Sequence, residues 1–165
     1  MKIDKLYLVG FMGAGKTTVA AALGSRLGWR TEDVDTSIEM RERRSVSAIF
    51  LREGEGYFRQ AEREVLRELL SERNIIVATG GGTFVDPDNR ALMLNDGAVA
   101  WLDLPLHRVI ERIPPDGRRP LASDPLHLEQ LYLRRQAAYQ DAHVRMDATA
   151  PVDEVVERLL EWIGY

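Results

Sequence analysis

The chain has 165 residues, of which 45% are hydrophobic and 29% charged, and its formal net charge is −4. This length and composition are typical of one globular domain and exclude an intrinsically disordered chain, while the acidic balance argues against a protein that binds nucleic acid. The absence of cysteine excludes disulfides and thiolate chemistry and leaves the redox compartment open. Since there is no apolar run long enough to cross a membrane and no signal-peptide core, we expect a cytoplasmic protein without a membrane partner.

The N-terminal segment predicts a strand, a glycine loop and a helix in that order. Residues 6–9 form a short apolar run that ends at Gly10, as in a buried parallel strand. Helical periodicity follows over residues 16–27, and Gly28 is a suitable stop. A second parallel strand is then expected to end near Asp33.

From residue 75 onward, apolar runs typical of buried strands alternate with amphipathic segments typical of helices. Asp86 and Pro87 form a good N-cap and first-turn pair. Such alternation predicts a parallel sheet covered on both faces. In chain order we expect a strand over 75–78, a helix after Pro87, a strand over 98–102, a helix after Pro105, a helix over 126–142, a strand over 144–148 and a helix over 152–163.

Two segments interrupt this alternation. Residues 36–73 are almost wholly helical, with breaks expected near Ser45 and near Gly54 and Gly56, which indicates a helical insertion. Residues 113–124 are rich in proline and arginine and predict a mobile lid.

The strongest motif is a phosphate-binding loop. Residues 10–17 read Gly-Phe-Met-Gly-Ala-Gly-Lys-Thr and match G-x-x-x-x-G-K-[ST] in full. Its glycines let backbone N–H groups point at phosphate oxygens, and the following helix adds the positive end of its dipole. Lys16 can then reach the β- and γ-phosphates and the Thr17 hydroxyl can ligate Mg²⁺. A glycine turn that binds nothing is the alternative, which the preceding strand and following helix disfavour.

Asp33 and Asp35 follow the first helix, where the second strand is expected to end. Ligands of open α/β sheets gather at the carboxyl ends of the strands. Carboxylates at this edge are suited to hold water on Mg²⁺ and to orient an attacking hydroxyl. An exposed acidic turn is the alternative, and from these two residues alone it carries equal weight.

Arg59 and Glu62 lie three residues apart on a predicted helix, and Glu62 falls inside its apolar arc. Buried charges need partners, and this spacing lets the two side chains meet. The pair is either a structural ion pair or an arginine that Glu62 holds in place to bind an anionic substrate.

Arg135 projects from the middle of an apolar helical stripe, whereas Arg134 lies at its margin. An inward-facing cation is unfavourable unless an anion meets it, and that anion is either a protein carboxylate or a ligand. We favour the ligand because the functional edge of the sheet is expected nearby. The stripe consists of Leu128, Leu131, Tyr132, Ala138, Tyr139 and Ala142.

Two further features are candidates for the same site. Gly80, Gly81 and Gly82 follow a buried strand and permit close backbone approach to a ligand, although a plain turn is the alternative. Arg118 and Arg119 in the predicted lid are suited to neutralise a transferred phosphoryl group. For them the alternative is a solvated basic loop.

These features together resemble the shikimate kinase family over nearly the whole chain. The loop over 10–17 is shared by many kinases, but the ordered set is specific to this family. The matching features are the loop, Asp33-Val34-Asp35, Phe58-Arg59 with Glu62, Gly80-Gly81-Gly82, Arg119-Pro120-Leu121 and Arg135 four residues before Tyr139.

The resemblance implies a role for each matching position. It implies that Asp35 binds the reacting hydroxyl and acts as base, with Lys16 and Arg119 as the other catalytic residues. It implies a metal site at Thr17 and Asp33, and a substrate site made by Asp35, Arg59, Gly80, Gly81, Gly82 and Arg135. It implies nucleotide binding by Gly13, Ala14, Gly15, Lys16, Thr17, Thr18, Arg112 and Arg119.

The resemblance also implies the fold and the reaction. The family fold is a three-layer α/β domain, here residues 1–165, with a five-stranded parallel sheet in the order 2-3-1-4-5, a substrate-binding insertion over about 34–62 and a lid over 113–124. The implied reaction transfers the γ-phosphoryl group of ATP, with Mg²⁺, to the 3-hydroxyl of shikimate, in chorismate and aromatic amino acid biosynthesis. A monomer is expected.

Two alternatives to this function stay open on the sequence. Another small-molecule P-loop kinase, such as a gluconate or nucleoside monophosphate kinase, explains Lys16 and Thr17 equally well but does not require Asp35, Arg59 and Arg135 as a set. The second alternative is a relative that binds nucleotide without catalysis. Loss of Asp35, Arg59 or Arg135 would indicate such a protein, and all three are present. The chain also departs from the family in having polar Thr31 and Glu32 before Asp33.

Overall fold

A computed structural model describes residues 2–113 and 124–165. Five strands form one parallel sheet in the order β2-β3-β1-β4-β5, which confirms the predicted topology. The strands are β1 (Lys5–Val9), β2 (Arg30–Asp33), β3 (Ile75–Ala78), β4 (Ala98–Asp103) and β5 (Val144–Asp147).

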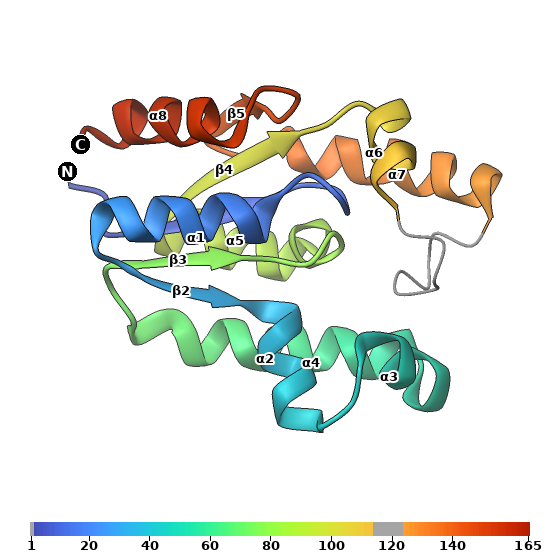
Figure 1. Cartoon of the computed structure of the whole chain (residues 1–165). Helices are drawn as coiled ribbons and strands as arrows, with labels where there is room; N and C mark the ends of the chain where they lie inside the picture. Colours follow the sequence, from blue (N-terminus) through green and yellow to red (C-terminus); the bar gives the residue numbers. More distant parts are fainter. Residues whose placement is uncertain (1, 114–123) are drawn as a thin grey trace.

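Helices cover both faces of this sheet (Figure 1). The helices α1 (Lys16–Leu27) and α8 (Val152–Ile163) pack against each other on one face. On the other face lie α5 (Pro87–Asp96) and α7 (Pro125–Tyr139), with the short α6 (Leu106–Arg112) leading into the segment before α7. Right-handed crossovers between parallel strands require this division.

The predicted helical insertion lies beside the edge strand β2 (Figure 1). It consists of α2 (Val34–Glu42), α3 (Val46–Glu53) and α4 (Glu55–Glu68), followed by the 3₁₀ turn η1 (Leu69–Ser71). The first helix begins two residues earlier than expected because the Asp33 carboxylate accepts from the backbone N–H of Thr36 and caps it. Ser45 caps α3 in the same way, as its predicted break suggests.

The second predicted break occurs at Gly54 alone. Gly54 has a φ of 84° between α3 and α4, whereas Gly56 lies inside α4.

The predicted lid over 113–124 falls, apart from its two end residues, outside the described residues, and so do Arg118 and Arg119. None of the helices within 2–113 and 124–165 has the length and apolar character needed to span a membrane.

The core is densest around the central strands, where every residue of β1 and β3 is buried. Lys5 is also fully buried and pairs with Asp96 at 2.6 Å, and the same carboxylate oxygen accepts from the Tyr7 hydroxyl at 2.6 Å. The edge strand β2 is exposed or half-buried throughout, which accounts for its polar sequence. The core therefore fixes the central strands, and their carboxyl ends carry the cleft described next.

Candidate active site

The phosphate-binding loop connects β1 to α1 as the motif predicts. Gly10, Gly13 and Gly15 all have positive φ, at 149°, 80° and 90°. A β-carbon at Gly10 would lie 2.6 Å from the Leu102 carbonyl oxygen, so only glycine fits there. Gly15 supplies no capping side chain to α1, and the first N–H groups of a helix lack intrahelical acceptors. The start of α1 is therefore suited to an anion.

Two cationic side chains lie against this loop. The Lys16 ammonium donates to the carbonyls of Gly10, at 2.5 Å, and Phe11, at 3.2 Å. Arg112, at the end of α6, donates to the carbonyl of Gly13 at 3.0 Å. The structure thus brings the predicted Arg112 from almost a hundred residues away to the phosphate loop.

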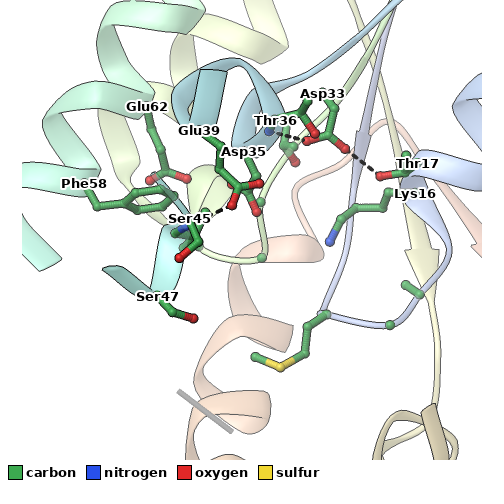
Figure 2. Close-up of a pocket in the computed structure, with 18 of the residues that line it drawn as sticks. Lys16, Thr17, Asp33, Asp35, Thr36, Glu39, Ser45, Ser47, Phe58 and Glu62 are labelled. Carbon is green, nitrogen blue, oxygen red and sulfur yellow. Dashed lines mark hydrogen bonds between the residues drawn. The ribbon is translucent and has the colours of Figure 1, made fainter. Parts of the chain in front are cut away.

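Thr17 and Asp33 form the predicted pair of hard oxygen donors beside the loop. The Thr17 hydroxyl donates to Oδ2 of Asp33 at 2.5 Å, while Oδ1 of Asp33 caps α2 through the Thr36 N–H at 3.0 Å (Figure 2). Within the described residues there is no cluster of three or more metal-ligating side chains. This donor set fits Mg²⁺, which usually takes one or two protein oxygens and completes its shell with phosphate and water.

Each of the three consecutive glycines after β3 has acidic or basic side chains close against its backbone. A β-carbon at Gly80 would lie 2.8 Å from Oδ1 of Asp35. At Gly81 it would lie 2.7 Å from Nη1 of Arg135, and at Gly82 it would lie 2.5 Å from Nη2 of Arg59. Any side chain here would displace one of these groups, which explains three glycines where a turn needs fewer.

Arg59 and Glu62 form the predicted pair within α4. Glu62 is fully buried, and its Oε1 accepts from Nη1 of Arg59 at 2.7 Å. Glu55 accepts a second, more exposed bond from Nη2 of Arg59 at 3.2 Å. Burial acts to lower the pKa of Arg59, but attraction and hydrogen bonds from Glu62 and Glu55 outweigh it and raise that pKa. Arg59 is therefore a firmly charged and oriented cation.

Arg135 of α7 is buried, with only 5% of its surface exposed. Among residues 2–113 and 124–165 no carboxylate lies within ion-pairing distance of it, and its guanidinium lies 5.6 Å from the centre of the Phe11 ring. Burial is the main cause that lowers its pKa, and repulsion from Arg59 adds to it. In the described part of the chain Arg135 therefore has the Phe11 ring beside it and no carboxylate partner, so its guanidinium is suited to bind an anion in the cleft.

One cleft of about 930 Å³ joins these groups. Figure 2 shows Lys16, Thr17, Asp33 and Asp35 around the same space. Of the predicted site residues only Arg119 lies outside the described residues. Those that line the cleft are Gly13, Ala14, Gly15, Lys16, Thr17, Thr18, Asp33, Asp35, Arg59, Gly80, Gly81, Gly82, Arg112 and Arg135.

Residues of the helical insertion line one side of the cleft, and the sequence analysis gave several of them no role. Glu39 lies one helical turn after Asp35, and its carboxylate accepts from the Val46 N–H at 3.0 Å, which ties α3 to α2. Phe50 and Phe58 pack with ring centres 5.0 Å apart. Only the four-residue spacing from Asp35 could have indicated Glu39. The other residues without a predicted role are Thr36, Ser45, Val46, Ser47 and Thr79.

Comparisons with known proteins show which family the chain belongs to. The shikimate kinase family model matches residues 12–164. The chain belongs to the shikimate kinase family. A curated shikimate kinase of Persephonella marina is 38% identical over 160 residues, which cover 93% of this chain and 98% of that relative.

Solved structures support both the family and its wider fold. The shikimate kinase of Acinetobacter baumannii in complex with shikimate is 34% identical, with a TM-score of 0.93 over 98% of this chain and 93% of that one. A deoxyadenosine kinase of M. mycoides with bound dATP, at 18% identity, has a TM-score of 0.66 over 98% of this chain and 100% of that one. The second likeness concerns the fold alone, which this shikimate kinase family member shares with other P-loop kinases.

Proposed function

We propose that this chain transfers the γ-phosphoryl group of ATP to the 3-hydroxyl of shikimate, giving shikimate 3-phosphate and ADP for aromatic amino acid biosynthesis. The observation that carries the proposal is the buried Arg135, which has no carboxylate partner among the described residues and opens with Arg59 onto the cleft of the phosphate loop. Two arginines for one carboxylate are the expected means of holding a small acid.

The substrate is held by its two ends. Arg59 and Arg135 bind the carboxylate, and the backbone of Gly80, Gly81 and Gly82 lines the ring. Asp35 accepts a hydrogen bond from the 3-hydroxyl. As that oxygen attacks the γ-phosphorus, its proton passes to the Asp35 carboxylate and the bond from the γ-phosphorus to the β,γ-bridging oxygen breaks, which releases ADP.

The phosphates are held by the loop. Backbone N–H groups of Gly13 to Thr18 surround them, Lys16 leaves its carbonyl contacts to reach the β- and γ-phosphates, and Arg112 lies alongside. Thr17 and Asp33 would hold Mg²⁺ directly or through water. When bound, the ion neutralises charge that develops on the phosphate oxygens. Arg119, outside the described residues, is proposed to add a further positive charge there.

A coupled assay of ADP release tests this function. Purified protein is supplied with MgATP and one acceptor at a time: shikimate, gluconate, a nucleoside monophosphate or none. We expect ADP only with shikimate. ADP with another acceptor would favour another P-loop kinase, and no ADP with any of them would favour a nucleotide-binding protein without catalysis.

Cytoplasmic location and a monomeric state stay predictions. Light scattering on the purified protein measures the oligomeric state.

A further inference from the structure

Glu62 is a fully buried side chain that holds Arg59 in place. Its carboxylate is fully buried, and Oε1 is taken by Nη1 of Arg59. A buried carboxylate needs a donor on each oxygen, because an oxygen without one pulls the group toward any other cation or donor nearby. The partner of Oε2 therefore decides how firmly Glu62, and with it Arg59, stays in place.

That partner is the hydroxyl of Thr83, which donates to Oε2 of Glu62 at 2.5 Å. Thr83 is fully buried and opens the 3₁₀ turn η2 (Thr83–Val85), directly after the three glycines. Its carbonyl accepts from Nδ2 of Asn89 in α5 at 3.2 Å, and Asn89 is itself buried. The hydrogen bond from Asn89 of α5 thus holds the backbone of Thr83, and the Thr83 hydroxyl points at the Glu62 carboxylate on α4.

The position of Arg59 depends on this contact because backbone limits its guanidinium on the side of Gly82, while the side chain also opens onto the cleft. The group lies against Gly82, where a β-carbon would be 2.5 Å away. Its neighbour Arg135 lies against Gly81 at a comparable distance. A shift of Glu62 would move one arginine relative to the other, and displacements of about 1 Å in a binding group weaken function severely.

We propose that Thr83 is a positioning residue for the substrate carboxylate, acting through Glu62 to set the place of Arg59 beside Arg135. The inference rests on the proposed function, since it concerns the same acid-binding site. In this proposal a buried hydroxyl that touches no substrate keeps the two guanidinium groups at a fixed distance from each other.

A purely structural role is the competing explanation, in which the hydroxyl only satisfies a buried oxygen. The two explanations differ in what they change. A structural role lowers stability and leaves the kinetic constants of the folded protein alone. A positioning role raises the KM for shikimate while leaving kcat and the KM for ATP nearly unchanged.

The test compares Thr83→Val, which keeps the shape and removes the hydroxyl, with Thr83→Ser, which keeps the hydroxyl. Ser37→Ala is the matched control, because the Ser37 hydroxyl also donates to a carboxylate, that of Glu32, away from the cleft. Steady-state constants are measured for each substrate, and the dissociation constant of shikimate is measured by calorimetry on protein shown to be folded by circular dichroism.

We expect Thr83→Val to raise the KM and dissociation constant of shikimate roughly tenfold, with kcat and the KM for ATP within about twofold of wild type. Thr83→Ser is expected to restore shikimate binding, and Ser37→Ala to change nothing. If Thr83→Val does not fold, Thr83→Ala takes its place, and the same changes in the constants are expected.

Three outcomes would overturn the inference: unchanged shikimate binding in folded Thr83→Val, no rescue by Thr83→Ser, or failure of both hydroxyl-free variants to fold. In each, the wild type still phosphorylates shikimate. A wild type that neither binds nor phosphorylates shikimate would instead contradict the proposed function, so the two failures are distinguishable.

Discussion

The guanidinium of Arg135 rests so closely on Gly81 that a β-carbon there would lie 2.7 Å from Nη1. We predict that Gly81→Ala pushes this guanidinium out of its place and raises the KM for shikimate by roughly 10- to 100-fold, with the KM for ATP nearly unchanged. Steady-state kinetics with each substrate varied in turn measures both.

Gly56→Ala is the matched control for that substitution. Gly56 lies inside α4, and no atom lies within 4 Å of a β-carbon built on it. Alanine there is expected to stabilise the fold by about 0.5–1 kcal/mol and to leave the kinetics unchanged. Equal kinetic effects of the two substitutions would mean that Gly81 has no special relation to Arg135.

Arg135→Met is predicted to weaken shikimate binding without lowering the stability of the fold. Because the buried guanidinium has no carboxylate partner in the described part of the chain, replacing it by an apolar group of similar length should leave stability unchanged or raise it. The KM for shikimate should rise by about 100-fold or more, since one of two cations for the carboxylate is lost. Urea unfolding and steady-state kinetics measure the two effects.

The exposed neighbour provides the control, because Arg134→Met removes the same charge from the outer face of α7. It should change neither quantity appreciably. A clear loss of stability in Arg135→Met, with shikimate binding retained in the folded fraction, would show that Arg135 serves the fold rather than the substrate.

Asp35→Asn is predicted to remove the proton acceptor while keeping the shape of the site. We expect kcat to fall by about 100-fold or more, the usual contribution of a positioned base, while ATP still binds. Steady-state kinetics measures kcat and a nucleotide titration measures ATP binding, with the exposed Asp153→Asn as control. Turnover near that of the wild type would remove Asp35 from the chemistry.

Asp96 is predicted to govern stability at the end of β1 that is distant from the cleft. Asp96→Asn breaks a pair in which Lys5 is fully buried, and we expect it to cost about 3–5 kcal/mol. Glu157→Gln, which breaks an exposed pair with Arg26, should have a much smaller effect because solvent screens that pair. Urea unfolding at neutral pH compares the two, and equal losses would contradict the buried network.

The same network has a predicted dependence on pH. Burial acts to raise the pKa of Asp96, but hydrogen bonds from Lys5 and Tyr7 and attraction by Lys5 and Arg73 lower it below its ordinary value. A lowered folded-state pKa means that the stabilisation is complete above the unfolded pKa of about 3.9 and is lost as pH falls through the folded value. The unfolding free energy of Asp96→Asn should therefore fall less steeply in acid than that of the wild type.

Sequence reasoning found the parts of the site that depend on local pattern. The phosphate loop is contiguous, and the burial of Arg135 and Glu62 follows from helical periodicity. The strand order came from the family resemblance, because the polar sequence of β2 gives little sign of a strand. Its edge position, with one neighbour only, explains why Arg30 and Thr31 can stay exposed there.

Contacts between distant segments could not be predicted in the same way. The hydroxyl of Thr83 and the carboxylate of Glu62 meet across 21 residues, and no periodicity connects a 3₁₀ turn to a helix. The close approach of acidic and basic side chains to each of the three glycines likewise depends on how α2, α4 and α7 converge on the end of β3. These relationships arise from packing, which a linear pattern does not specify.

The most direct test of the account is the structure of the product. The protein is incubated with MgATP and shikimate, and the phosphorus is located by ³¹P–¹H correlation in the NMR spectrum. We predict one phosphate monoester on the 3-hydroxyl, formed in equal amount with ADP. Free phosphate, an ester on another hydroxyl or unchanged shikimate would contradict the placement of the 3-hydroxyl between Asp35 and the phosphate loop.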